Sequence, residues 1–278
     1  MEEQAKPSCI REYFIAGGPS EKSIVPDYPA PYAYNNAVGD ILKYQARPAD
    51  VQDLVMLVAN EGGKFRAIKG HWVSTVSGIA YGDEKLSRFK VIPRSEDLIQ
   101  LGRLELITTK KAIDMPITTS SYYESILNPE LRRSDLILGR ELTEEEALEH
   151  AIWKTVVPDT KVLEKFIETV YRKIREEGRM TCMGIYLPNP LHPDERPEYD
   201  PKEFPKGMRM IRPLSMVGPD LMDDSIMTKM CQMVAIIEGT PEEVKRHKKA
   251  IRIIRENTIV MPDLPPLFGE HYPDKEDG

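Results

Sequence analysis

The amino-acid sequence predicts an α+β protein, and three segments carry this prediction. Residues 233–257 read as an apolar strand, then the helix-start pattern Thr-Pro-Glu-Glu, then a long amphipathic run. Residues 160–177 place apolar side chains at the 3.6-residue spacing of one helix face. Residues 64–81 read as two strands joined near Gly70. We therefore expect a mixed N-terminal region, a helical middle and a small C-terminal sandwich of strands and helices.

The first region, residues 9–115, follows residues 1–8, which we expect to be unstructured. Its first strand is predicted over Ile10–Ala16 and ends at a Gly-Gly pair. Residues 19–36 then interleave prolines with tyrosines, and proline cannot take part in a regular ladder. We predict an extended arm here, with its rings packed on the surface of the same subunit or of a neighbour.

The rest of this region carries start and stop signals for short elements. Asp50 caps a predicted helix that runs to Asn60 and ends at a second Gly-Gly pair. Its apolar face holds Val51, Leu54, Val55 and Val58. The further predicted elements are strands at Lys64–Lys69, Trp72–Tyr81 and Leu104–Thr108, and a short helix from Ser95 to Gly102.

The middle, residues 116–178, is predicted to be helical. The expected helices are Thr118–Leu127, one that starts at Thr143 and runs through Val156, and Thr160–Glu177. Thr143 and Glu146 make the capping box of the second helix. His150 follows Glu146 by one helical turn, and we expect a surface ion pair here rather than two metal ligands.

The last region, residues 179–265, completes the predicted sandwich and precedes a charged, loose tail at 266–278. Its expected elements are a strand at Met180–Leu187, a polar loop at 188–207, a strand at Met208–Val217, a helix at Pro219–Gln232, and the strand and helix of 233–257. Pro213 predicts that the 208–217 strand lies at a sheet edge or ends early.

Composition excludes several classes of function. The chain has 278 residues and a formal net charge of −7, which disfavours nucleic-acid binding over a broad surface. It has no apolar run of the roughly 18 residues that a membrane span needs. The polar N-terminus lacks a secretory signal, so we expect a cytoplasmic protein.

The cysteines and the short motifs identify no cofactor. Cys9, Cys182 and Cys231 are odd in number and far apart, which argues against disulfides and a standard zinc site. Methionines flank two of them, so a soft-metal site is one alternative, and core packing is the other. The sequence lacks the Gly-x-Gly-x-x-Gly, Walker A and Gly-x-Ser-x-Gly patterns.

Two basic segments give the leading functional prediction. Arg66, Lys69 and His71 cluster around one predicted turn, and Lys110 and Lys111 follow the next predicted strand. The four cations could hold a carboxylate or phosphate, and His71 titrates near neutral pH. We therefore predict a cytosolic, homo-oligomeric enzyme that acts on a small anionic metabolite, with His71 as general acid or base. The competing interpretation is a solvated strand face.

The main alternative is a non-catalytic subunit of a larger assembly. The proline–tyrosine arm favours it, and so does a basic stripe on the last predicted helix. The stripe consists of Lys245, Lys248, Lys249, Arg252 and Arg255. A solvated helix face is the simpler interpretation of the same pattern.

Overall fold

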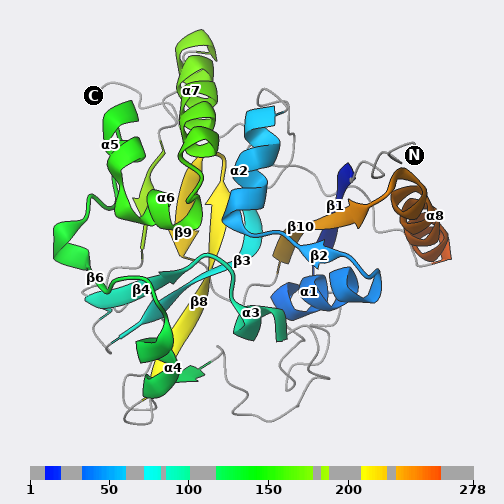
Figure 1. Cartoon of the computed structure of the whole chain (residues 1–278), viewed down its shortest axis with the longest axis horizontal. Helices are drawn as coiled ribbons and strands as arrows, with labels where there is room; N and C mark the ends of the chain where they lie inside the picture. Colours follow the sequence, from blue (N-terminus) through cyan, green and yellow to red (C-terminus); the bar gives the residue numbers. More distant parts are fainter. Residues whose placement is uncertain are drawn as a thin grey trace, which may run out of the picture.

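Strands from both ends of the chain pair in one mixed sheet in the computed structural model (Figure 1). The structure describes residues 10–19, 33–60, 72–82, 86–100, 117–177, 183–187, 208–223 and 230–257. The strand path runs β1 (Ile10–Pro19), β10 (Met230–Gly239), β3 (Trp72–Tyr81), β8 (Met208–Val217), β9 (Asp220–Asp223) and β7 (Ile185–Tyr186). Beside this path lie β2 (Arg47–Pro48) on β10, β4 (Arg88–Ile92) on β3, β6 (Leu131–Arg132) on β4, and β5 (Ile117–Thr119) on β8.

The strand β3 changes partners along its length. It pairs in parallel with β10 at Ser74 and Met233, and its last four residues pair antiparallel with β4. The strand β8 runs antiparallel along the other side of β3. The register slips between Ser74 and Gly78, so residues 75–77 of β3 stand against Leu214 alone. We call residues 75–77 the β3 insert.

Hydrogen bonds from several other segments satisfy the β3 insert. Its Thr75 carbonyl accepts from the Tyr34 hydroxyl at 2.8 Å, and the Thr75 hydroxyl donates to the Leu214 carbonyl at 2.6 Å. Val76 N–H donates to the Ala49 carbonyl at 3.1 Å, and the Val76 carbonyl accepts from Ser95 N–H at 2.8 Å. The Ser77 hydroxyl accepts from Val51 N–H at 2.9 Å and donates to the Pro93 carbonyl at 2.5 Å. The insert is therefore the point where the surrounding loops are fixed.

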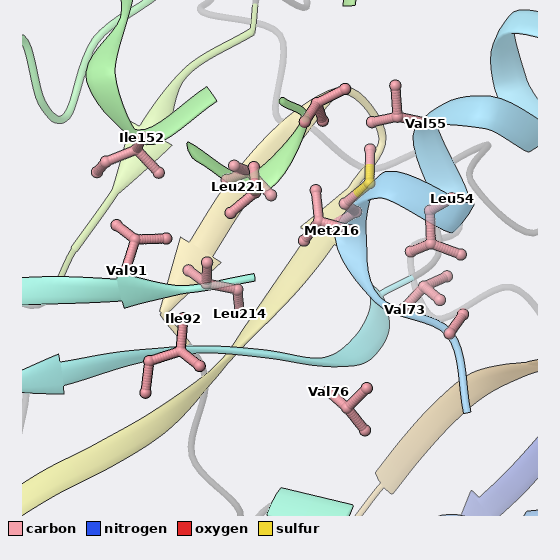
Figure 2. Close-up of a cluster of buried hydrophobic side chains, with 14 of the residues drawn as sticks. Leu54, Val55, Val73, Val76, Val91, Ile92, Ile152, Leu214, Met216 and Leu221 are labelled. Carbon is pink, nitrogen blue, oxygen red and sulfur yellow. The ribbon is translucent and has the colours of Figure 1, made fainter. Parts of the chain in front are cut away.

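Helices cover both faces of the sheet. On one face, α2 (Val51–Asn60) and α6 (Ala151–Val156) place Leu54, Val55 and Ile152 near Leu214 and Met216 (Figure 2). The helices α7 (Thr160–Glu177) and α5 (Glu144–Glu149) pack behind them. On the other face lie α3 (Glu96–Gln100) against β3, and α4 (Ser120–Ser125) against β5 and β8. The helices α1 (Ala33–Lys43) and α8 (Pro241–Asn257) contact β1 and β10.

The coarse sequence prediction is confirmed. The chain combines helices with a mixed sheet, and β3, β8 and α7 have the predicted bounds. The capping box of Thr143 and Glu146 is present, and Asp50 accepts a hydrogen bond from Asp53 N–H at the start of α2. At the start of α8, Thr240 N–H donates to Glu243 Oε2 at 2.8 Å, a capping contact that agrees with the predicted helix start at Thr-Pro-Glu-Glu.

The helix predicted at Pro219–Gln232 is wrong. Its first residues form β9, and Met230–Gln232 belong to β10. Gly218 has φ 62°, a conformation that favours glycine. The chain therefore reverses at Gly218 and Pro219, and Asp220 pairs directly with Val217.

The edge position predicted from Pro213 is also wrong, because β8 has neighbours on both sides. The strand β3 lies on one side, and β5 and β9 share the other. Pro213 falls between the β8 residues that pair with β5 and those that pair with β9, and it lies beside the β3 insert. A proline is tolerated there because the ladder is interrupted locally.

Three further boundaries differ from the prediction. The helix predicted through Val156 is split at His150 into α5 and α6. The predicted 19–36 arm ends inside α1, which begins at Ala33, and its residues 20–32 lie outside the described part. The helix predicted at Thr118–Leu127 starts instead as β5.

We expect Thr75→Val to lower the free energy of unfolding by about 1–3 kcal/mol, because it leaves the buried Leu214 carbonyl and Ser77 N–H without the hydroxyl. Urea denaturation measures this loss. Ser134→Ala, which removes an exposed hydroxyl, is the control. Equal midpoints for the two variants would contradict the role of the insert.

Candidate functional site

The residues predicted to form the anion site lie outside the part of the chain that the structure describes. They are Arg66, Lys69, His71, Lys110 and Lys111. Their convergence on one hollow therefore stays a prediction. The nearest described residues are Trp72 and Ile117, and both belong to strands that pair with β8.

These two described residues meet β8 at opposite ends. Trp72 pairs with Val217, and Ile117 pairs with Met210. Seven steps along a strand of about 3.3 Å each separate the two points by roughly 23 Å. His71 is bonded to Trp72, whereas Lys111 precedes Ile117 by six residues. Convergence therefore requires the chain before Ile117 to cross most of that distance.

The cysteines are attached to the described sheet at separate places. Cys231 lies in β10 opposite Gly18, and Cys9, outside the described residues, is bonded to Ile10 at the other end of β1. Eight strand steps of about 3.3 Å place Ile10 and Gly18 roughly 26 Å apart. A soft-metal site shared by the cysteines therefore stays a prediction. Cys182 also lies outside the described residues.

A cluster of five charged residues surrounds the start of α2. Arg47 donates to both carboxylate oxygens of Asp53, at 2.5 and 3.0 Å, and to Glu238 of β10 at 2.9 Å. Asp50 and Asp53 cap each other through their backbone N–H groups, at 3.1 and 2.9 Å. Arg94 donates to the Pro48 carbonyl and lies 3.7 Å from Asp50 Oδ2. We call this set the α2 charge cluster.

The pKa values of the two aspartates in the α2 charge cluster are shifted in opposite directions. Burial and the neighbouring charge of Asp53 raise the pKa of Asp50 to about 6. Burial also opposes ionisation of Asp53, but hydrogen bonds and charge from Arg47 outweigh it, and the pKa of Asp53 is lowered. The hydrogen bond with Asp53 raises the pKa of Arg47. The cluster holds three carboxyls and two guanidiniums, so it joins β2, α2 and β10 rather than offering a strong anion site.

A buried polar triad joins three strands at one face of the sheet. The Tyr81 hydroxyl donates to Asp223, and the Arg212 guanidinium forms an ion pair with the same carboxylate. The Asp223 side chain is fully buried, and that of Arg212 is 7% exposed. A phenol on an ion-paired carboxylate is a possible proton donor in chemistry. Its burial leaves no open side for a substrate, so the triad is structural.

His150 is a structural residue, contrary to the predicted surface ion pair with Glu146. The imidazole is buried, its Nδ1 accepts from Ile152 N–H at 3.3 Å, and its Nε2 donates to the Ile137 carbonyl at 3.0 Å. Burial lowers the pKa of His150, so the neutral form is favoured. Glu146 instead bonds Arg140 at 2.6 Å and caps α5. The imidazole caps α6, which is why the helix is split here.

Asp220 ties β9 to the segment before β7. Its Oδ1 accepts from Gly184 N–H at 2.7 Å, and Leu221 N–H donates to the Gly184 carbonyl at 2.9 Å. Burial, with a contribution from the charge of Glu141, raises the pKa of Asp220 to about 6. The carboxylate is therefore useful as an acceptor but costly to ionise in the folded state.

Within the described residues, the groups whose pKa values are shifted thus take part in helix capping or in contacts between strands. No three His, Cys, Asp or Glu residues in this part of the chain are placed to hold a metal ion. Among the described helices, none combines the length and apolar character needed to cross a membrane. The sequence signal for the missed triad is Arg212 inside an apolar strand, since a buried guanidinium requires an acid.

No family model matches the sequence, and no curated protein matches it. A solved structure described as "Accommodation of massive sequence variation in Nanoarchaeota by the C-type lectin fold" is similar at 12% identity and a TM-score of 0.46. That similarity covers 85% of this chain and 99% of the other. A likeness of this size supports no conclusion about fold or function.

We expect Asp223→Asn to cost about 3–5 kcal/mol in the free energy of unfolding, because it removes a buried negative charge that is paired with the buried Arg212 guanidinium. Lys154→Ala, which breaks an exposed pair with Glu149, should cost less than about 1 kcal/mol. Chemical denaturation of both variants measures the difference. A loss for Asp223→Asn no larger than that for Lys154→Ala would remove the triad from the core.

We expect Asp220→Asn to stabilise the protein above pH 6 and to lose this advantage in acid. The pKa of Asp220 is raised to about 6, so the folded state binds a proton more readily than the unfolded chain, and ionisation costs stability at higher pH. Asparagine keeps the acceptor for Gly184 and cannot ionise. Urea midpoints at about pH 7.5 and about pH 4.5 should show a gain at the higher pH that shrinks at the lower. The exposed change Asp135→Asn is the control, and a gain equal at both pH values would rule out ionisation as the cause.

Proposed function

We propose that the protein is a non-catalytic subunit of a larger assembly and that α8 is its contact element. The observation that carries this proposal is the separation of charge between α8 and the rest of the chain. Residues 241–257 hold six lysines and arginines and three glutamates, a net charge of +3. Because the whole chain carries −7, the residues outside α8 carry −10. A basic helix on an acidic body favours contact with an acidic partner.

The position of α8 supports the same proposal. The helix lies at one margin of the molecule, beside β1 and β10 (Figure 1). Val244 is buried at 1% exposure and faces the body. Lys245, Arg246, Lys248 and Lys249 are exposed. The described buried charges, by contrast, are engaged in internal contacts such as Arg212 with Asp223.

An enzyme that acts on a small anionic metabolite is the second candidate, with His71 as general acid or base. Its support is the sequence pattern: Arg66, Lys69 and His71 cluster around one predicted turn, and Lys110 and Lys111 follow the next predicted strand. Its test is thermal stabilisation by a panel of carboxylates and phosphate esters, compared with Lys110→Ala/Lys111→Ala. We expect a shift that the variant loses, and the absence of any shift would count against this candidate.

The remaining sequence predictions are kept as proposals. These are the cytosol as location, a homo-oligomer as the working form, and the division of the chain near residues 115, 178 and 265. Strands from the first and last of these regions pair with each other in one sheet, so the proposed regions share a core.

An acidic peptide tests the proposed function. We expect a fluorescent oligoglutamate peptide to bind the wild-type protein at about 50 mM salt and to be released at about 500 mM, where screening shortens the range of surface charges. Lys245→Glu/Lys249→Glu should lose this binding, because it reverses two exposed charges of α8. Lys43→Glu/Lys161→Glu changes the same total charge away from α8 and should retain it. Equal binding by both variants would contradict α8 as the contact element. A single-stranded RNA that binds in place of the peptide would also contradict a protein partner.

A further inference from the structure

We infer that α8 of one copy docks on the acidic end of α5 in a second copy of this chain. This inference rests on the proposed function and names the partner. The acidic α5 end is residues 141–149, which contain five glutamates and no lysine or arginine. Glu141, Glu144, Glu145 and Glu149 are exposed there. The stretch offers a second copy several carboxylates within about two helical turns.

The existing contacts of these glutamates do not block docking. Glu144 pairs with Arg175, and Glu149 pairs with Lys154 at 2.5 Å. In each of these pairs both side chains are well exposed, from 46% to 72%. Exposed pairs contribute little to stability, so lysines of another chain can compete for the same carboxylates.

Geometry selects a head-to-tail contact. Figure 1 places α8 and α5 at opposite margins of the molecule, so one copy cannot join its own two surfaces. Two α8 helices would repel each other because each carries a net charge of +3. A symmetric contact through α8 is therefore disfavoured, and a contact between unlike surfaces generates a ring or an open chain.

Charge reversal provides the test, with mass measured by sedimentation at two salt concentrations. Wild-type protein should self-associate at about 50 mM salt and dissociate at about 500 mM. Lys245→Glu/Lys249→Glu changes the net charge of residues 241–257 from +3 to −1, and Glu141→Lys/Glu145→Lys changes that of residues 141–149 from −5 to −1, so each variant loses the charge of one of the two surfaces. Each variant alone should remain monomeric. A mixture of the two should associate again, because each presents the surface that the other lacks.

Two outcomes would overturn the inference: a wild-type protein that stays monomeric at both salt concentrations, or reversed variants that associate as well alone as when mixed. Circular dichroism of each variant checks that the exposed substitutions leave the fold intact. Oligoglutamate binding separates the two proposals. If the protein is monomeric but still binds the peptide through Lys245 and Lys249, the proposed function stands. Only the second copy of the chain is then excluded as the partner.

Discussion

The β3 insert is the constraint on which the rest of the structure depends. Three residues of a central strand stand against one residue of β8, so their polar groups need partners outside the ladder. Tyr34 from α1, Ala49 before α2 and Ser95 before α3 supply them. A buried donor or acceptor left without a partner is costly, so these contacts fix where the three helices begin relative to the sheet.

The buried ionisable groups, like the buried backbone groups, are held by bonded partners. Asp223 neutralises the Arg212 guanidinium inside the sheet, and Tyr81 bonds the same carboxylate. His150 is buried as a neutral ring because both of its nitrogens are bonded. Inner charges thus serve the fold, whereas the lysines of α8 remain on the surface. This division is why we place the working surface on α8 rather than in the described interior.

Local signals in the sequence were sufficient where an element is determined by its own residues. The spacing in α7, the box at Thr143 and the apolar run of β3 each specify their element without tertiary information. They failed where a partner strand decides the structure. The segment β9 is a strand because the chain turns back on β8 at Gly218, and Pro213 is accepted because the register slips in the part of β3 beside it. The candidate functional residues were harder to predict from the sequence than the secondary structure. Asp223 owes its role to Tyr81 and Arg212, which sequence spacing does not reveal, and the predicted cations lie outside the described residues.

The pairing of β1 with β10 has a consequence for biosynthesis. All ten residues of β1 find their partners between Met230 and Gly239, more than 200 positions later in the chain. A ribosome therefore releases the first strand long before its complement exists. Until then this segment is unpaired, and chaperones or another nascent chain can bind it. The pairing is completed only after residue 239 has been translated, and truncation before residue 230 leaves β1 without its complement.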